Sequence, residues 1–519
     1  MLEYGDVIGG SCLSMKVLIA NRGEIAVRVI RACREMGLPT VAVYSDCDRA
    51  ALHVRYADEA YPLGGNAPAD SYLRIDKLVD AARRSGADAV HPGYGFLAEN
   101  EAFARACADA GLVFVGPPAG AIERMGSKTA ARQAALAAGV PVVPGTTEPL
   151  PPGATEAEIA AAADHVGYPI FVKAVAGGGG KGMRLVADPA DLPSAVRAAR
   201  SEAGSSFGHP AIYIERQLVR PRHIEIQLLA DAAGTVVPFV ERECSIQRRH
   251  QKVLEESPSV AVTPDTRRAL AEAASAVART VGYVNAGTIE FLMDADGRFY
   301  FLEMNTRLQV EHPITELVSG VDLVRWQLRI ARGERLDLPA ELALSPRGHA
   351  VECRIYAEDP DNGFLPSPGL LLGRRVPGGP GIRRDDGGAT PGLEVPIYYD
   401  PLIAKLTAWG ASRQEAIERL GRALGEYEVR GIKTSIPFFR WLFQNDDFRG
   451  GRFDTTFLDR ELAARNGAPF VTVPAEAEHV ALLAAAVHAF DRASAGSAAP
   501  GRGPAASAWK TAGRVEGLR

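Results

Sequence analysis

The stretch RFYFLEMNTRLQVEHP, from Arg298 to Pro313, constrains the fold of this chain more than any other stretch. Polar and apolar residues alternate along it, so an extended segment would turn one polar face outward and one apolar face toward a core. The polar positions are Glu303, Asn305, Arg307, Gln309 and Glu311. A solvated strand face does not need this mixture of acid, amide and guanidinium groups followed by a rigid His-Pro pair. The stretch therefore predicts a strand that carries a functional site.

The run before it, Gly287 to Met293, also predicts a strand, and Asp296-Gly297 between the two is typical of a hairpin turn. A two-residue turn would place Glu290 directly opposite Glu303. Two facing carboxylates repel by up to roughly 4 kcal/mol at about 4 Å and an effective dielectric near 20, unless a cation lies between them. A hard cation such as Mg²⁺ fits, with Asn305 and phosphates completing an all-oxygen site. A three-residue loop without a compensating bulge would instead put the two acids on opposite faces.

Length and composition limit the class of protein. A chain of 519 residues predicts three or four domains, and its net charge of −5 indicates no general affinity for nucleic acid or an anionic membrane. No apolar run is long enough to span a bilayer, and the first fourteen residues lack the pattern of a secretory signal, so we interpret them as a disordered leader. The six cysteines form no CxxC pair, which favours a reducing cytoplasm.

The N-terminal part alternates strands and helices. A strand at Met15 to Ala20, an amphipathic helix ending at Gly37 and a strand at Thr40 to Ser45 predict a βαβ unit of a parallel sheet. The turn holds only Gly23, so the dinucleotide fingerprint is absent and a nicotinamide enzyme is not expected. The loop His91 to Asn100 lies at the carboxyl end of this sheet, where ligands bind in such folds, although a structural turn explains it equally well.

A glycine-rich segment follows at Tyr168 to Val186. Its glycines match GxGxxG by spacing, but the residues after them predict a strand, and the GK-[ST] of a P-loop is missing. We interpret the segment as a hairpin lid whose backbone N–H groups close over phosphates, with Lys173 at the end of the incoming strand. A plain flexible loop is the alternative, although four consecutive glycines make it costly in folding entropy.

Several other patterns carry polar groups to predicted strands and helices. Lys128 opens a helix; His223, Glu225 and Gln227 alternate along a strand; and a basic cluster lies within Glu241 to Glu256. Beyond Pro313 we expect one helix from about Thr315 to Arg332, and Arg354 on a strand. From about Ala475 the chain predicts an Ala-rich helix followed by a linker.

These motifs together resemble the biotin carboxylase component of biotin-dependent carboxylases, an ATP-grasp family. The resemblance runs from about Met15 to about Asp459 and rests on IANRGEIAVRVIRA, HPGYGFLAEN, KAVAGGGGKGMR, RPRHIEIQ, ERECSIQRRHQKVLEE, EMNTRLQVEHPITE, GHAVECRIYAEDP and FLPSPG. It implies an α/β and α+β fold with a disordered leader at 1–14, an N-terminal parallel-sheet, Rossmann-like domain at 15–127, an ATP-grasp domain at 128–346 with a glycine-rich lid at about 145–217, a mixed α/β C-terminal biotin carboxylase domain at 347–459, and an Ala-rich helix, linker and tail at 460–519.

The resemblance also implies roles for matching residues. ATP would be bound by Lys128, Lys173, Gly178, Gly179, Gly180, Glu215, Leu218, His223, Gln247 and His250. Mg²⁺ or Mn²⁺ would be held by Glu290, Glu303 and Asn305, and bicarbonate by Arg307, Gln309 and the backbone of Val310. Glu311 would deprotonate bicarbonate, Arg354 would stabilise the biotin enolate, and Lys252 would lie near carboxyphosphate. Beside the adenine, Arg216 and Gln217 depart from the lysine and aromatic residue that are common in the family.

The implied reaction is the ATP- and bicarbonate-dependent carboxylation of biotin through carboxyphosphate, the first half-reaction of an acyl-CoA carboxylase. No Met-Lys-Met trio is present, so we expect the biotin carrier and the carboxyltransferase on other chains, and a homodimer of this one. The final acyl-CoA or pyruvate acceptor is not specified by this sequence. Three alternatives stay open: another ATP-grasp ligase that uses carboxyphosphate or an acyl phosphate, a nucleotide-binding regulatory module that has lost catalysis, and an assembly scaffold.

Overall fold

The computed structural model describes residues 15–146, 148–151, 153–174, 183–207, 211–388, 391–472 and 474–495. The predicted leader at 1–14, the lid glycines Gly178, Gly179 and Gly180, and the tail beyond residue 495 lie outside the described residues. The chain divides into two units, Met1–Ala468 and Pro469–Arg519. All of the predicted site residues belong to the first unit.

The N-terminal segment forms the predicted parallel sheet, with strand order β3-β2-β1-β4-β5. Along β1, Val17 and Ile19 belong to one hydrophobic core and Leu18 to another, because helices cover both faces of the sheet. The strands are β1 (Val17–Ile19), β2 (Thr40–Tyr44), β3 (Glu59–Pro62), β4 (Ala89–His91) and β5 (Val113–Phe114), and the helices are α1 (Gly23–Glu35), α2 (Leu52–Tyr56), α3 (Ile75–Ser85), α4 (Glu101–Asp109) and α5 (Ala119–Gly126).

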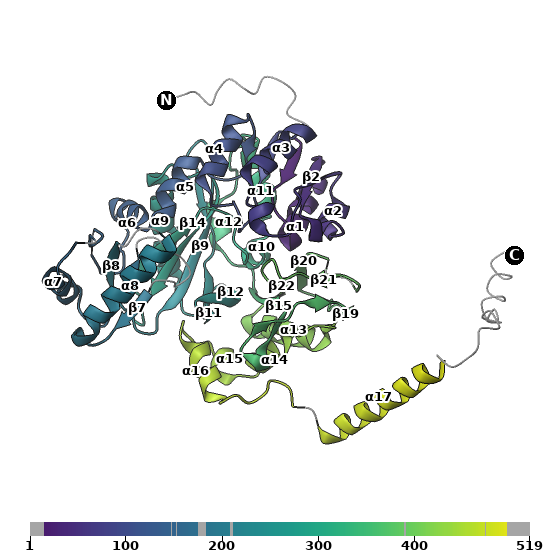
Figure 1. Cartoon of the computed structure of the whole chain (residues 1–519). Helices are drawn as coiled ribbons and strands as arrows, with labels where there is room; N and C mark the ends of the chain where they lie inside the picture. Colours follow the sequence, from purple (N-terminus) through teal and green to yellow (C-terminus); the bar gives the residue numbers. More distant parts are fainter. Residues whose placement is uncertain are drawn as a thin grey trace. The chain divides into compact units, whose positions relative to one another are not determined.

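A nine-stranded antiparallel sheet joins the central and C-terminal segments (Figure 1). Its order is β14-β13-β9-β11-β12-β15-β22-β20, and β10 pairs with β9. The strands are β9 (Arg222–Ala230), β10 (Val236–Pro238), β11 (Arg242–Arg248), β12 (Gln251–Ser257), β13 (Asn285–Met293), β14 (Phe299–Asn305), β15 (His349–Tyr356), β20 (Ile382–Asp386) and β22 (Leu402–Gly410). Because β12 pairs with β15, Lys252 and Arg354 lie on neighbouring strands although about a hundred residues separate them in sequence.

The hairpin of β13 and β14 shows one wrong prediction and one confirmed prediction. The predicted two-residue turn is wrong: the Asp294 N–H donates to the Arg298 carbonyl at 2.8 Å, which leaves a three-residue loop with Gly297 at φ 79°. Further along, β14 carries one extra residue, Leu302, between the pairs Phe291↔Phe301 and Glu290↔Glu303. This bulge restores the register, so the facing acids are confirmed.

Two other boundaries differ from prediction. The strand β14 ends at Asn305, so the predicted extended conformation through Glu311 is wrong and the segment 306–311 is irregular. The predicted single helix from Thr315 to Arg332 is two helices, α10 (His312–Ser319) and α11 (Leu323–Ala331), because Gly320 takes a left-handed conformation with φ 73°.

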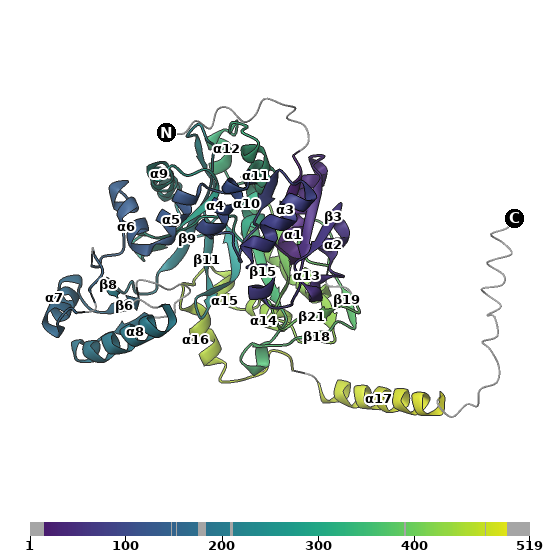
Figure 2. The same ribbon diagram turned by 45° about the horizontal axis from the view of Figure 1, so that its top comes forward.

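The glycine-rich segment lies between antiparallel strands β6 (Ile170–Ala174) and β7 (Met183–Val186), as predicted for a hairpin lid. With β8 (Ile212–Arg216) they form a three-stranded sheet, β7-β6-β8. Helices α7 (Glu156–Val166) and α8 (Leu192–Phe207) cover this sheet, and the group has its own core, which includes Ile170 and Val172. Figures 1 and 2 show it as a separate lobe of the first unit.

The remaining elements complete the two units. Those of the first unit are α6 (Lys128–Ala137), α9 (Pro264–Thr280), α12 (Ala340–Leu344), β16 (Glu358–Asp359), β17 (Leu365–Pro366), β18 (Gly369–Leu370), β19 (Gly373–Arg375), β21 (Glu394–Val395), α13 (Arg413–Glu426), β23 (Glu428–Arg430), α14 (Ile436–Leu442), α15 (Asp446–Arg449) and α16 (Phe457–Ala464). The second unit holds the predicted Ala-rich helix, α17 (Ala475–Ala495). No helix within the described ranges is long and apolar enough to cross a bilayer.

Candidate functional site

A cavity of about 510 Å³ opens between the lid strands and the nine-stranded sheet. Among the described residues, every predicted site residue except Glu311 lines it. These are Lys128, Lys173, Glu215, Leu218, His223, Gln247, His250, Lys252, Glu290, Glu303, Asn305, Arg307, Gln309, Val310 and Arg354. Glu311 is fully buried behind Lys252 and Arg354. The structure therefore brings residues from across the sequence to one place.

Lys252 on β12 is the centre of a buried cluster of acids. Its Nζ donates to Glu225 at 2.5 Å, to Glu290 at 2.7 Å and to Glu311 at 2.7 Å. Burial opposes the charge on Lys252, but the three carboxylates outweigh burial and raise its pKa well above the ordinary value. Arg242, which is also fully buried, donates to Glu225, to Gln227 at 2.9 Å and to Thr315 at 2.9 Å. Two cations, Lys252 and Arg242, thus offset part of the charge of the three acids.

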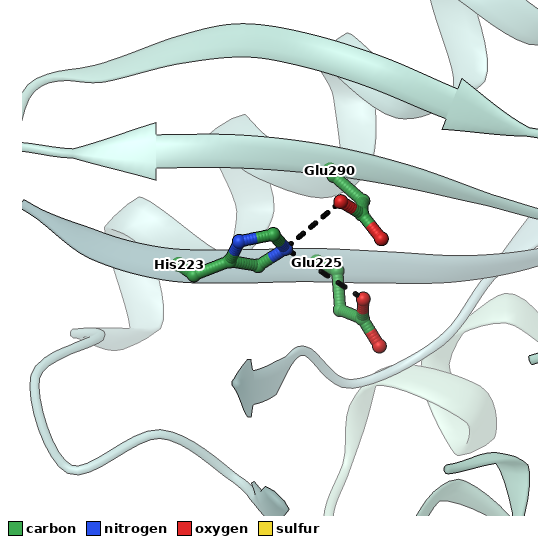
Figure 3. A group of neighbouring side chains, drawn as sticks. All are labelled: His223, Glu225 and Glu290. Atoms are coloured by element: carbon green, nitrogen blue, oxygen red, sulfur yellow. Dashed lines mark ion pairs between the residues drawn. The ribbon is translucent and has the colours of Figure 1, made fainter. Parts of the chain in front are cut away.

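His223 joins two acids of this cluster, and Figure 3 shows its ring paired with both Glu290 and Glu225. Its Nε2 lies 3.0 Å from Glu290 and 4.0 Å from Glu225. Burial lowers the pKa of the His223 ring, but Glu290 and Glu225 reverse this effect and raise it overall. The Gln247 side chain contacts the other ring nitrogen at 3.1 Å. His223, Glu225 and Glu290 each bring one possible ligand atom to within 4.8 Å of the other two.

Glu303 fits the predicted metal site. Its carboxylate faces the cavity opposite Glu290 and forms no hydrogen bond or ion pair with any other residue in the described ranges. Although Glu303 is accessible through the cavity, the loss of bulk solvent around it and the charge of Glu290 both raise its pKa. The Asn305 amide donates to Glu290 at 2.8 Å. An unpaired carboxylate facing a second carboxylate is a donor set that suits a hard divalent cation, so Glu290, Glu303 and Asn305 fit Mg²⁺ or Mn²⁺.

Glu311 and Arg354 form a buried ion pair beside this cluster. The Arg354 guanidinium donates to Glu311 at 2.9 Å and to Glu255 at 2.6 Å. Burial alone would raise the pKa of Glu311, but Lys252 and Arg354 outweigh burial and hold it well below its ordinary value. The resting Glu311 carboxylate is therefore ionised and shared by two cations.

Three predicted site residues on the irregular segment 306–311, Arg307, Gln309 and Val310, line the cavity. Arg307 donates to Gln309 at 2.9 Å, to Asn305 at 3.1 Å and to Glu99 at 2.8 Å, so its guanidinium is held in one orientation. Val310 lines the cavity, and its N–H has no acceptor in the part of the chain that the structure describes. A guanidinium and a free backbone N–H are donors that suit a small carboxylate-like anion.

The other end of the cavity lies beneath the lid. Lys173 forms an ion pair with Glu215, and Lys128 at the start of α6 lies nearby. Burial lowers the pKa of Lys128, and the charge of Lys173 lowers it further. The Arg216 guanidinium points toward α7 and donates to the Val166 carbonyl at 2.6 Å, which gives this departure from the family pattern a structural role.

Sequence reasoning gave no role to several buried groups of the site. Glu225 and Arg242 form the floor of the Lys252 cluster, Glu255 holds Arg354, and Arg132 contacts Glu215 at 3.3 Å. The alternation of His223, Glu225 and Gln227 was the one signal that could have identified Glu225. The other three lie in elements whose polar residues follow no clear period.

The chain matches three family models along its length. "Biotin carboxylase, N-terminal domain" matches residues 14–122, "Carbamoyl-phosphate synthase L chain, ATP binding domain" matches 127–339, and "Biotin carboxylase C-terminal domain" matches 352–460. A pyruvate carboxylase subunit of Methanothermobacter thermautotrophicus is 52% identical over 445 residues, which cover 86% of this chain and 89% of that protein. A biotin carboxylase of Nostoc sp. is 51% identical over 85% of this chain and 98% of its own length.

Solved structures agree with these relatives. The biotin carboxylase domain dimer of the Hydrogenobacter thermophilus 2-oxoglutarate carboxylase, in complex with MgADP, ADP and bicarbonate, superposes with a TM-score of 0.83 at 46% identity over 88% of this chain and 99% of that one. A biotin carboxylase from Campylobacter jejuni gives a TM-score of 0.82 at 43% identity over 86% of this chain and 98% of that one. The protein therefore belongs to the biotin carboxylase family of ATP-dependent, ATP-grasp ligases.

Proposed function

We propose that this chain carboxylates biotin on a separate carrier protein, with ATP and bicarbonate as the other substrates, in the first half-reaction of an acyl-CoA carboxylase. The observation that supports this most is the meeting, at one cavity, of Arg307 and Val310 with the ion pair of Arg354 and Glu311. Neither half alone specifies the reaction. Together they supply an anion site, a base and an oxyanion donor.

The lid end of the cavity is the proposed nucleotide site. Lys128 and Lys173 bind the phosphates, and Gly178, Gly179 and Gly180 belong to the same proposed site. The residues around the nucleotide are Glu215, Leu218, Gln247 and His250. Glu290, Glu303 and Asn305 would hold Mg²⁺ or Mn²⁺, which neutralises charge on the transferring phosphoryl group when it is bound. Closure of the lid, at about 145–217, excludes water from carboxyphosphate.

Bicarbonate binds to Arg307, Gln309 and the Val310 N–H. Glu311 takes its proton, a bicarbonate oxygen attacks the γ-phosphorus, and ADP leaves, so that carboxyphosphate forms. The lowered pKa makes the resting Glu311 a weak base. Incoming anions attract Lys252 and Arg354 away from Glu311, and the loss of these two cations raises its pKa as the substrates arrive.

Transfer to biotin uses the other side of the same ion pair. Carboxyphosphate breaks its C–O bond and releases CO₂ and phosphate beside Lys252. Phosphate takes the N1′ proton of biotin, and Arg354 donates to the enolate oxygen that this leaves. The N1′ nitrogen then attacks CO₂ and forms carboxybiotin.

The partners follow from this chemistry. One relative is named as a subunit of a pyruvate carboxylase, and one similar solved structure is a pyruvate carboxylase of Rhizobium etli, of which this chain covers 41%. We propose that the biotin carrier and the carboxyltransferase are separate chains here, and that this chain forms a homodimer, as the Hydrogenobacter domain does.

The test is ADP formation by the purified chain with MgATP, bicarbonate and free biotin. We expect turnover that requires both bicarbonate and biotin, with label from bicarbonate recovered in an acid-labile biotin product. Turnover that responds to ammonia in place of biotin would identify the alternative ligase. Complete absence of ATP cleavage would favour a regulatory module or a scaffold.

A further inference from the structure

We propose that two buried side chains outside the cavity, Lys405 and His312, are positioning residues that aim the Val310 N–H at bicarbonate. They hold the two peptide groups on either side of Val310. The inference rests on the proposed bicarbonate site and adds two residues that do not touch the substrate.

Lys405 on β22 is fully buried, and its closest contact is a neutral group. Its Nζ donates to the Val310 carbonyl at 2.8 Å, whereas it lies 3.2 Å from Glu24 and 3.9 Å from Asp385. The two acids come from α1 and β20, so three segments distant in sequence surround this amine. A buried lysine whose best hydrogen bond is to a carbonyl holds that carbonyl in place, while the acids stabilise its charge.

His312 holds the preceding peptide group. Its Nδ1 lies 2.8 Å from the Gln309 carbonyl, which can only accept, so Nδ1 carries the proton. The ring is fully buried, and burial together with the nearby charges of Lys405 and Arg28 keeps its pKa well below the ordinary value. His312 is therefore a neutral donor with a fixed tautomer.

These two bonds determine the direction of the Val310 N–H. A trans peptide group is planar, so holding the Gln309 carbonyl fixes the Val310 N–H on the opposite side of that plane. Holding the Val310 carbonyl likewise fixes the plane of the next peptide group, which joins Val310 to Glu311. The segment needs such support because it lies between the end of β14 and the start of α10 and has no strand or helix of its own to order it.

The arrangement also explains a motif that has no part in the chemistry. Glu24 follows the Asn-Arg-Gly turn after β1 and lies in the first turn of α1, far from the reacting groups in sequence. Its carboxylate is buried and, among the described residues, has no hydrogen-bond donor other than the Lys405 amine beside it. Removal of Lys405 alone would leave Glu24 without its cation, although Asp385 keeps its ion pair with Arg383 at 2.8 Å. Removing one partner of a buried pair destabilises a fold more than removing the whole pair.

The first experiment compares His312→Asn with His312→Leu. Asparagine and leucine have nearly the same size, but only asparagine keeps an N–H close to the position of Nδ1. We expect His312→Leu to raise the KM for bicarbonate by about tenfold, the loss of roughly one hydrogen bond, with the KM for ATP within about twofold of wild type. His312→Asn should restore the bicarbonate KM to within about threefold of wild type. Equal KM values for the two variants would overturn the assignment of His312.

The second experiment compares the double variant Lys405→Met/Glu24→Gln with Glu24→Gln alone. The double variant removes both charges but also the bond to Val310, whereas the single variant keeps that bond. We expect the double variant to bind ADP normally and to raise the bicarbonate KM by about tenfold, and the single variant to change it by less than about threefold. If the double variant does not fold, the His312 pair still decides the question.

The controls separate this inference from the proposed function. A wild-type chain whose ATP cleavage ignores bicarbonate overturns both. A wild-type chain that depends on bicarbonate, with variants whose bicarbonate KM is unchanged, overturns only the positioning role. A parallel rise in the KM for bicarbonate and for ATP would show a merely structural role and would overturn it as well.

Discussion

Two lysines in this protein, Lys252 and Lys405, each lie among buried acids, yet they make opposite use of their charge. Lys252 borders the cavity and contacts three carboxylates at 2.5 to 2.7 Å. Lys405 is sealed from solvent, and its two acids lie at 3.2 and 3.9 Å while a carbonyl accepts its shortest bond. The pKa of Glu311 beside Lys252 is lowered, whereas that of Glu24 beside Lys405 is raised to about 7.

The difference shows how one residue type serves chemistry in one place and architecture in another. A cation at a cavity can exchange carboxylate partners for substrate anions, because its partners and its new ligands carry the same charge. A fully buried cation cannot contact substrate anions, so it affects the reaction only through the backbone carbonyl that it holds. We therefore expect substitutions around Lys252 to affect turnover and those around Lys405 to affect substrate affinity.

The largest effect should come from Lys252→Met. This variant leaves Glu225, Glu290 and Glu311 without their shared cation and removes positive charge beside carboxyphosphate. We expect ADP formation to fall at least about a hundredfold, as when a preorganised donor is lost. Steady-state rates in bicarbonate and biotin measure the effect, and ADP binding by calorimetry reports whether the variant is folded.

Lys16→Met is the control, since it removes the 2.8 Å ion pair of Lys16 with Glu59 in the N-terminal domain. Retention of more than a tenth of the activity would remove the contrast between the two lysines.

Glu311→Gln should reduce the bicarbonate-dependent rate by about a hundredfold, the contribution of a general base. Glutamine keeps the size of the side chain, and its one amide oxygen can still accept from either Lys252 or Arg354, so the fold should persist. The kinetic measurement is the bicarbonate dependence of ATP cleavage with and without biotin. Wild-type turnover in this variant would exclude Glu311 as the base.

Arg354→Ala separates the reaction of ATP with bicarbonate from the transfer to biotin. We expect ATP binding to stay within about threefold of wild type and the biotin-stimulated rate to fall by about a hundredfold, because the enolate loses its oxyanion donor. The readout is the ratio of ATP cleavage with biotin to that without it. An unchanged ratio would assign Arg354 a purely structural role.

The acids around Lys252 could largely be predicted from the sequence, whereas the contacts of Lys405 could not. The alternation around Glu303 and the strand before it predicted the facing acids, although the turn length was wrong. The Asp294 carboxylate accepts from the N–H groups of Asp296 and Arg298, which favours the longer loop, and the bulge at Leu302 then corrects the register. A bulge leaves no periodic signal in a single sequence. The predicted pairing of Glu290 with Glu303 is therefore right although the predicted turn length is wrong.

The Lys405 side could not be predicted in the same way. Its partners Glu24, Val310 and Asp385 lie far apart in the chain, and no local pattern links them. One clue was available: Lys405 interrupts the apolar run LIAKLTAW, where a charged residue predicts either an edge strand or a buried partner. Similarly, Gly320 within a helical pattern could have indicated the break between α10 and α11, because glycine commonly ends helices in the left-handed conformation.

The last prediction is a pH dependence of stability on the Lys405 side. Burial, which outweighs the attraction of Lys405, raises the pKa of Glu24 from its ordinary value near 4.5 to about 7. Between these two values the folded chain keeps the Glu24 proton while the unfolded chain has lost it. The contribution of Glu24 to folding therefore becomes less favourable as pH rises from about 4.5 to about 7, by up to roughly 3 kcal/mol, and is constant above that range.

Glu24→Gln removes this titration, so the variant should gain stability relative to wild type between pH 5 and pH 8, measured as the difference in urea denaturation midpoints. Glu59→Gln is the matched control: the pKa of Glu59 is lowered by Lys16, so its folded and unfolded values both lie below pH 5 and its difference from wild type should not change over this range. If the Glu24→Gln and wild-type curves run parallel from pH 5 to pH 8, Glu24 is ionised throughout this range. Lys405 would then form a strong ion pair, as Lys252 does, and its main role would not be to hold the Val310 carbonyl.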